Sequence, residues 1–202
     1  MSRAFAVFFA ISLLLAACGS KGEGGSSSAK AETAAAEAPT QPLALPETGT
    51  VPKPEVFEDI VESYLAIGAR LVADDGAGAA KAFGALGGML ASVSEGVLAD
   101  LKVRSAVLDA SNSANIEEQR WVFEGLSRAL DALLEEGGNP TGRALHRAHC
   151  PMAFKNRGAI WIQSEETIAN PYYGASMLKC GSLRKTFEPK AEEDVEAAKT
   201  AE

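Results

Sequence analysis

Residues 115–140 of the chain read NIEEQRWVFEGLSRALDALLEEGGNP, and this stretch indicates a helical fold. Its apolar side chains recur at intervals of three or four residues, which places them on one face of an α-helix. These side chains are Phe123, Leu126, Leu130, Leu133 and Leu134. Asn115, with glutamates at 117 and 118 behind it, is typical of a helix N-cap, and the Gly-Gly-Asn-Pro sequence at 137–140 predicts the helix end.

Two earlier segments have the same helical period. One stripe contains Phe57, Ile60, Val61, Tyr64, Leu71 and Val72, and the other contains Phe83, Leu86, Leu90, Val93 and Val97. The sequence Asp-Asp-Gly at 74–76 separates them, and a short helix over 101–108 completes the set. We therefore predict a mainly α fold, an up-and-down bundle of three to four helices. No glycine-rich phosphate loop follows a strand pattern, which excludes nucleotide-binding folds.

After Pro140 the helical period stops. Residues 146–156 have no regular pattern, residues 158–163 have the apolar and aromatic content of a strand, and residues 170–174 are typical of a turn. We expect a C-terminal cap on the bundle that is loop-rich or carries a short β-hairpin. Its aromatic side chains are predicted to pack in the core and the turn rather than bind a ligand; they are Trp161, Tyr172 and Tyr173.

The N-terminus has the pattern of a lipoprotein leader. Arg3 precedes an apolar run over 4–17, which indicates a secretory signal and is shorter than the roughly 20 residues of a membrane-spanning helix. The run ends in Leu-Ala-Ala followed by Cys18, which resembles the lipobox of lipoprotein signal peptidase. We predict that residues 1–17 are removed and that a lipid on Cys18 holds the protein on a membrane.

The rest of the chain divides into three parts. Residues 18–53 are predicted to be the lipidated cysteine and a disordered tether, since they are rich in Gly, Ser, Ala, Glu and Pro. Residues 54–187 form the helical domain, and residues 188–202 are a charged tail. The prediction is a cell-envelope protein, lipid-anchored and facing the periplasm. Gly19, in place of an aspartate, favours the outer membrane over the inner one.

Composition and motifs exclude two classes of function. The net charge of −8 makes nucleic acid an unfavourable partner. The chain has no readable catalytic triad or paired-carboxylate pattern, and it has no Cys-x-x-Cys motif of a thiol oxidoreductase. We therefore expect a protein that is not an enzyme.

The candidate binding site consists of two short motifs rich in sulfur. In Cys150-Pro-Met152 an extended backbone would place the thiol and the thioether on one face, and in Met177–Cys180 a helical turn would do the same. Two thiolates and two thioethers suit Cu(I), with Ag(I) as a surrogate, better than zinc. His149 is predicted to be an auxiliary ligand, whereas His146 is expected to be packed or exposed to solvent. Alternatively, Cys150 and Cys180 form a structural disulfide in an oxidising compartment.

The two motifs resemble a known family. The runs 149–163 and 168–181 contain a Cys-Pro-Met-Ala element, a Gly-x-x-Trp element, and Asn-Pro-Tyr-Tyr-Gly followed by Met-x-x-Cys-Gly. These elements resemble the family called domain of unknown function 3347, and residues 64–75 and 116–127 resemble its earlier helices. The family occurs alone in exported proteins and fused to periplasmic adaptor subunits of copper and silver efflux pumps. The resemblance implies a helical bundle and a role in handling heavy metals.

Together these observations predict an envelope lipoprotein that binds Cu(I) or Ag(I) for buffering or delivery to efflux. The predicted ligands are Cys150, Met152, Met177 and Cys180, with His149 as auxiliary. The expected partners are the membrane, through the lipid on Cys18, and a heavy-metal efflux complex or a periplasmic metallochaperone. The alternative is a disulfide-stapled interaction domain without metal, which docks on an envelope complex.

Overall fold

The computed structural model of the chain describes Leu43 and residues 50–190. The predicted leader 1–17, the lipidation site Cys18, most of the predicted tether and nearly all of the predicted tail lie outside these residues. In the part that is described, no helix combines the length and the apolar content needed to cross a membrane.

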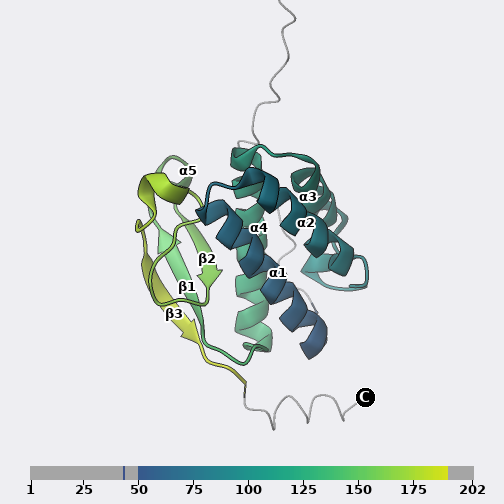
Figure 1. The fold of residues 1–202 in the computed structure, drawn as a ribbon. Coiled ribbons are helices and arrows are strands. Elements are labelled where there is room, and N and C mark those ends of the chain that lie inside the picture. Colours follow the sequence, from purple (N-terminus) through teal and green to yellow (C-terminus); the bar gives the residue numbers. More distant parts are fainter. Residues whose placement is uncertain (1–42, 44–49, 191–202) are drawn as a thin grey trace, which may run out of the picture. The chain divides into compact units, whose positions relative to one another are not determined.

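The described chain is mainly helical, with one small antiparallel sheet. Figure 1 shows the sheet on one side of the long helices, next to α4. The long helices are α1 (Pro54–Val72), α2 (Gly76–Leu90), α3 (Leu101–Asn112) and α4 (Ile116–Gly137). Shorter helical turns are η1 (Val97–Ala99), α5 (Ala153–Asn156) and η2 (Gly174–Met177). The strands are β1 (Leu145–Cys150), β2 (Ala159–Gln163) and β3 (Ser182–Phe187).

The helix ends follow the local capping chemistry. The Asn115 side chain accepts a hydrogen bond from the backbone N–H of Glu117 at 3.1 Å, which confirms the predicted N-cap of α4. Asp75 caps α2 in the same way, through the N–H of Gly78 at 2.8 Å. Gly138, with φ of 74°, ends α4 in a conformation that glycine adopts without strain.

Two helix lengths differ from the sequence prediction. Helix α3 continues to Asn112, beyond the predicted end at 108. Helix α2 stops at Leu90, because both the N–H and the hydroxyl of Ser92 bond to the Met89 carbonyl and close the last turn. Val93 and Val97 therefore lie outside α2, although both side chains are buried in the core as the apolar stripe predicts.

The C-terminal region is more regular than predicted. Strand β1 lies in the centre of the sheet, with order β2-β1-β3 and both pairings antiparallel. The expected irregular segment 146–156 is therefore wrong for its first half. Leu-His-Arg-Ala-His-Cys has no β-branched or aromatic residue, so pairing on both sides, rather than intrinsic propensity, makes it a strand. The predicted hairpin corresponds to β1 and β2, and β3 extends it to three strands.

A buried hydroxyl cluster fixes the sheet to the helices. The Tyr64 hydroxyl on α1 is hydrogen-bonded to Ser127 Oγ on α4 at 2.7 Å and accepts the N–H of Ile162 on β2 at 3.1 Å. Tyr172 donates its hydroxyl to the carbonyl of Ile160, so tyrosine side chains satisfy backbone groups on the outer edge of β2. Because the bonds made by Tyr64 are buried, their pairing defines how the sheet sits against the helices.

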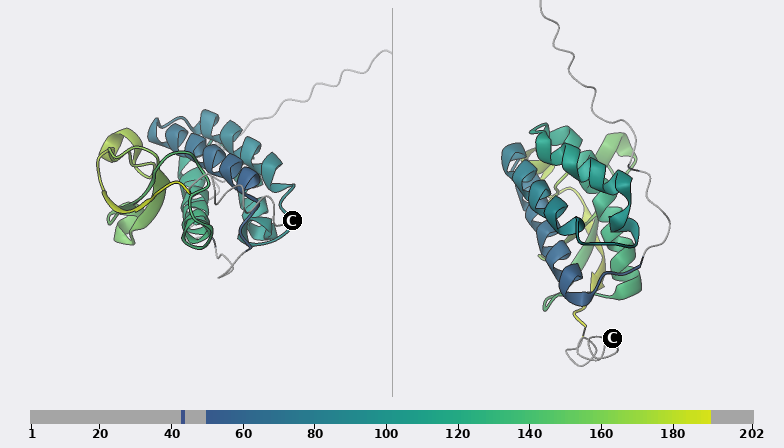
Figure 2. Two further views of the ribbon diagram at one scale, coloured as in Figure 1. Left: turned by 90° about the horizontal axis from the view of Figure 1, so that it is seen from below. Right: turned by 90° about the vertical axis from the view of Figure 1, so that its right-hand side faces the viewer.

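Aromatic packing surrounds this cluster. The Tyr64 ring stacks on Phe123 with ring centroids 4.6 Å apart, and Tyr172 lies 6.1 Å from Phe123 and 5.9 Å from Trp161. Trp161 and Tyr172 are buried and Tyr173 is half-buried, which confirms the predicted packing of the first two in the core. Figure 2 shows the same helix-and-sheet arrangement from two further directions.

The packed region extends past the predicted domain limits at both ends. Leu43 and Val51 pack against the core, and Arg128 donates a hydrogen bond to the Leu43 carbonyl at 2.6 Å. After β3, Pro189 forms a bridge with Asn139, and the N–H of Lys190 bonds to the Asn139 carbonyl at 3.0 Å. Side-chain contacts thus hold the N-terminal end of the domain, and main-chain contacts hold its C-terminal end.

We predict that Tyr64→Phe destabilises the protein by about 1–3 kcal/mol, because it leaves the buried N–H of Ile162 without an acceptor. Urea unfolding measures this change as a shift in the midpoint. The control is Tyr173→Phe, since the Tyr173 hydroxyl donates to the Met152 carbonyl at an exposed position. Equal losses in the two variants would contradict a structural role for the buried hydroxyl cluster.

Candidate functional site

The two cysteines of the predicted site lie in contact. The Sγ atoms of Cys150 and Cys180 are 3.1 Å apart, although 30 residues separate them in the sequence. Cys150 is fully buried at the end of β1, opposite Ala159 of β2, and Cys180 is half-buried just before β3. The fold therefore joins the Cys-Pro-Met and Met-x-x-Cys motifs at their sulfur atoms.

Asn170 holds the segment that carries Cys180. Its side-chain amide donates to the Cys180 carbonyl at 2.8 Å, and its N–H donates to the Leu178 carbonyl at 2.9 Å. Its side-chain oxygen accepts the N–H of Tyr172 at 2.8 Å. Asn170 is completely buried, so these bonds close the 170–180 segment into a loop with a fixed end at Cys180.

A charged pair attaches this loop to the helices. Arg120 on α4, which is 6% exposed, donates to the Pro171 carbonyl at 2.9 Å and to Asp74 at 2.6 Å. Asp74, in the turn between α1 and α2, also accepts the N–H of Ala175 at 2.9 Å. These hydrogen bonds hold the pKa of the Asp74 carboxyl below its usual value, the Ala175 N–H having the largest effect and Arg120 the next.

Gly181 lets the chain pass from Cys180 into β3. Its φ of 137° lies in a region that side chains disfavour, and a Cβ there would come within 2.8 Å of the Trp161 ring and 2.9 Å of the His149 carbonyl oxygen. Only glycine fits this position without movement of its neighbours. The backbone geometry therefore requires a glycine directly after Cys180 in the second motif.

The methionines flank the thiol pair along the chain. The i, i+2 alternation predicted for Cys150-Pro-Met152 is not observed, because Met152 has φ −89° and ψ −13° and turns the chain out of β1 into α5. The Met152 side chain is 45% exposed. Met177 is half-buried, and its carbonyl accepts the N–H of Cys180 at 3.0 Å, which is the predicted single turn. Their predicted ligand roles stay predictions.

The segment after Met152 has an unusual backbone. Phe154, Lys155 and Asn156 have φ of 50°, 59° and 65°, which is a left-handed conformation disfavoured for side-chain-bearing residues. The Phe154 ring holds this turn in place, since it lies 4.2 Å from Trp121 and 5.2 Å from Tyr172. The turn fixes the backbone that leads away from Cys150.

The two histidines occupy different environments from the thiols. His146 is buried, and its Nδ1 lies 3.1 Å from the hydroxyl of Thr186. His149 directly precedes Cys150 on β1, and successive side chains of a strand point to opposite faces. The auxiliary role of His149 therefore requires local movement of β1, and it stays a prediction.

The electrostatics of the pair favour the protonated form of the Cys180 thiol. The hydrogen bond to Cys150 raises the pKa of the Cys180 thiol, with burial and the charge of Cys150 adding to the effect. Burial, followed by the same two cysteines, raises the pKa of Tyr173. A cation that binds between the sulfurs must therefore displace protons, so its affinity rises with pH.

The separation of the sulfurs permits two kinds of chemistry. A disulfide needs the sulfurs to approach to about 2.05 Å. A metal with metal–sulfur bonds of about 2.3 Å in tetrahedral geometry needs them to separate to roughly 3.7 Å. The observed 3.1 Å lies between these values. Among the described residues no group of three or more His, Cys, Asp and Glu side chains forms a metal-binding cluster.

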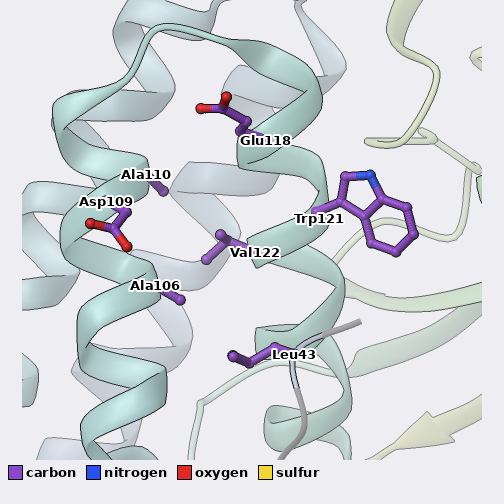
Figure 3. Close-up of a pocket in the computed structure, with 7 residues that line it drawn as sticks. All are labelled: Leu43, Ala106, Asp109, Ala110, Glu118, Trp121 and Val122. Carbon is purple, nitrogen blue, oxygen red and sulfur yellow. The ribbon is translucent and has the colours of Figure 1, made fainter. Parts of the chain in front are cut away.

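A groove of about 290 Å³ lies between α3 and α4 and contains none of the predicted site residues. Figure 3 shows its two walls, with Leu43 at one end and Trp121 turned toward the sheet. The lining side chains are Leu43, Ala106, Asp109, Ala110, Glu118, Trp121 and Val122. Apart from two carboxylates the lining is apolar, and it includes neither Cys150 nor Cys180.

Comparisons with protein-family models, with curated proteins and with solved structures find no match for this chain. The resemblance to domain of unknown function 3347 therefore stays a prediction.

Sequence reasoning missed the residues that hold the site together. The sequence patterns place Asn170 in a turn and in the Asn-Pro-Tyr-Tyr-Gly element, they make Asp74 part of a helix break, and they give Arg120 no role of its own. The available signal was the position of Asn170 and Gly181 within the quoted motif elements, since an Asn before Pro and a Gly after Cys both indicate a special backbone. The partners of Arg120 are 46 and 51 residues away, and no local pattern reveals them.

We predict that Asn170→Ala loosens the Cys180 loop. The variant should lose about 2–3 kcal/mol of unfolding free energy, because it unpairs buried backbone groups, and its thiols should react faster with an aromatic disulfide reagent under native conditions. Asn112→Ala, which removes one exposed hydrogen bond to Leu108, is the control. Wild-type thiol reactivity in Asn170→Ala would show that the loop is held by other contacts.

We predict that Asp74 contributes to acid sensitivity. Because its pKa is lowered in the folded state, its contribution to stability is present above the unfolded value of about 3.9 and is lost as pH falls through the lower folded pKa. The thermal midpoint of Asp74→Asn should therefore fall less steeply in acid than that of the wild type. Lys185 and Arg147 also lower the pKa of Glu135. The part of the acid dependence of the thermal midpoint that comes from Glu135 should therefore remain in the Asp74→Asn variant. Parallel pH profiles would contradict this assignment.

Proposed function

We propose that the protein is a lipid-anchored envelope protein that binds a soft monovalent cation, Cu(I) or its surrogate Ag(I), at the Cys150–Cys180 pair. The observation that carries the proposal is the 3.1 Å contact between the two sulfurs. Cys150 lies buried on β1, and Cys180 ends the 170–180 loop, which the Asn170 side chain closes. Thiolates prefer such soft cations over magnesium, calcium or manganese. The proposed role is binding, with no catalytic step.

Thioethers complete the proposed coordination. Met152 follows Cys150 by two residues and is exposed, so its flexible side chain can swing toward a cation at the thiols. Met177 lies one turn before Cys180 on the same held segment. Opening the sulfur pair by a fraction of an ångström is a smaller change than rebuilding a strand, and Cys180 at the half-buried side is the thiol free to shift.

The proposed location is supported by the leader pattern. Lipid on Cys18 would keep the protein at the envelope with its domain in the periplasm, and Gly19 favours the outer membrane. The domain would buffer the cation or pass it to a heavy-metal efflux complex or a periplasmic metallochaperone. The resemblance to domain of unknown function 3347 supports this setting, and with it the reading of α1 to α4 as an up-and-down bundle.

A second candidate function uses the same sulfur contact. If Cys150 and Cys180 are oxidised, the disulfide closes a loop of about 30 residues, and in the chain-entropy model this stabilises the fold by about 3–4 kcal/mol. The protein would then be a stapled interaction domain that docks on an envelope complex. The contact supports this candidate because only a small approach of the sulfurs is needed.

We predict that the reduced protein binds one Cu(I) per chain. The experiment uses the full-length chain with Cys18→Ser, so that thiol chemistry is confined to the pair, and titrates Cu(I) without oxygen against a chromogenic chelator. The Cys150→Ser, Cys180→Ser variant should lose the copper. The Met152→Leu, Met177→Leu variant should bind at least about tenfold more weakly, which corresponds to about 1.4 kcal/mol. Met89→Leu, outside both motifs, should bind as the wild type does.

Two further measurements distinguish the metal-binding function from the disulfide-stabilised interaction domain. The single variant Cys180→Ser changes only the half-buried cysteine and tests copper binding even if the double variant does not fold. Circular dichroism measures the helical content of each variant. Thiol counting on the protein as purified measures oxidation. Two oxidised cysteines, together with no copper bound after reduction, would overturn the metal proposal and leave the stapled domain.

A further inference from the structure

Charge is distributed unevenly between the two parts of the domain. Residues 50–142, which contain the long helices, have fifteen Asp and Glu against seven Lys and Arg. Residues 143–190, which contain the sheet and the thiol loop, have eight Lys and Arg against three Glu. The sheet region is therefore basic on a chain with net charge −8, and it attracts acidic groups that the helical region repels.

Strand β3 is an exposed part of this basic region. It is an edge strand, and residues 182–186 are exposed on both faces. Leu183 is 36% exposed, and Arg184 is the extra residue of a bulge, with no Cα partner on β1. Lys185 is paired with Glu135 of α4, which leaves Arg184 and Lys179 as exposed charges near the start of the strand.

The two edges of the sheet differ in their backbone hydrogen bonds. At β2 the hydroxyls of Tyr64 and Tyr172 satisfy the N–H of Ile162 and the carbonyl of Ile160. Apart from the pairing of β3 with β1, no hydrogen bond from the described residues reaches the β3 backbone between Leu183 and Thr186. One edge is closed by side chains, whereas the described part of the chain leaves the other open for strand pairing.

We propose that the open edge of β3 is a docking site for an extended acidic segment of a partner protein, which adds to the sheet as a further strand. Backbone hydrogen bonds would provide the affinity. The basic side chains Lys179 and Arg184 would select glutamate and aspartate on the incoming segment. This inference stands apart from the metal proposal and does not need copper to be bound.

Two other binding partners fit the edge of β3 less well. A second copy of this chain would bring Arg184 and Lys185 against the same residues, and like charges on paired strands are destabilising. An anionic membrane would satisfy the positive charges, but it offers no row of donors and acceptors for the open strand edge. A strand of acidic protein meets both requirements.

The position of the edge gives the docking site a relation to the thiols. Ser182, the first residue of β3, is two residues after Cys180 and pairs with His149, the neighbour of Cys150. A segment docked on β3 would therefore lie beside both motifs. Asn170 and Gly181 fix the start of β3, so the added strand would have a defined register relative to Cys180.

The test presents the full-length Cys18→Ser protein with a phage-displayed library of random dodecapeptides. Recovered peptides are synthesised, and their binding sites are mapped by changes in backbone amide chemical shifts. We expect enrichment of Asp and Glu, and shifts concentrated on residues 182–187. The Lys179→Glu, Arg184→Glu variant should bind these peptides at least about tenfold more weakly, since each reversal turns attraction into repulsion. Lys102→Glu, an exposed reversal on α3, should bind them as the wild type does.

Four results would overturn the proposal. Recovered peptides without acidic enrichment, or shifts confined to the groove between α3 and α4, would place recognition elsewhere. Failure to recover any binder would do the same, and so would binding to phosphatidylglycerol vesicles combined with no peptide binding, which would assign the basic surface to a membrane. Peptide binding that requires deletion of residues 191–202 would identify the chain's own acidic tail as the occupant.

Discussion

The hydroxyl group of Tyr64 is the contact on which the remaining geometry depends. It joins α1, α4 and β2 at one buried point, where every donor and acceptor has a partner. Buried polar groups tolerate little displacement, because a lost partner costs more than the pair gains. The sheet is thereby fixed on the helices, and β1 carries Cys150 to a position that no local feature of its own sequence specifies.

The thiol site consists of one rigid and one adjustable part. Cys150 lies on the central strand, whose backbone pairs on both sides, whereas Cys180 ends a loop attached by the side chains of Asn170 and Asp74. A change in coordination or oxidation would move the loop more readily than the strand. The left-handed turn at Lys155 adds a third constraint, since it fixes where the chain leaves the strand.

The sequence predicted the parts of the fold that depend on local periodicity and capping. The apolar stripe on α4 and the N-cap at Asn115 are two such parts. The residues of β1 were expected to be irregular because Leu145–Cys150 has no β-branched residue and is ordered by pairing on both sides. Strand β3 was not predicted, although it ends in Thr186 and Phe187. The two motifs suggest a contact between the sulfurs. The distance between them depends on hydrogen bonds of Asn170, Arg120 and Asp74, some of which join residues far apart in the sequence.

The tyrosine-covered edge of β2 also limits how this protein can assemble. A sheet grows without end only when each added molecule presents a fresh edge for the next one. Here copies of the chain have at most one edge to offer, so any pairing between them would end at two molecules. Even at high concentration, therefore, strand pairing could not join the sheets of many copies into a continuous fibre.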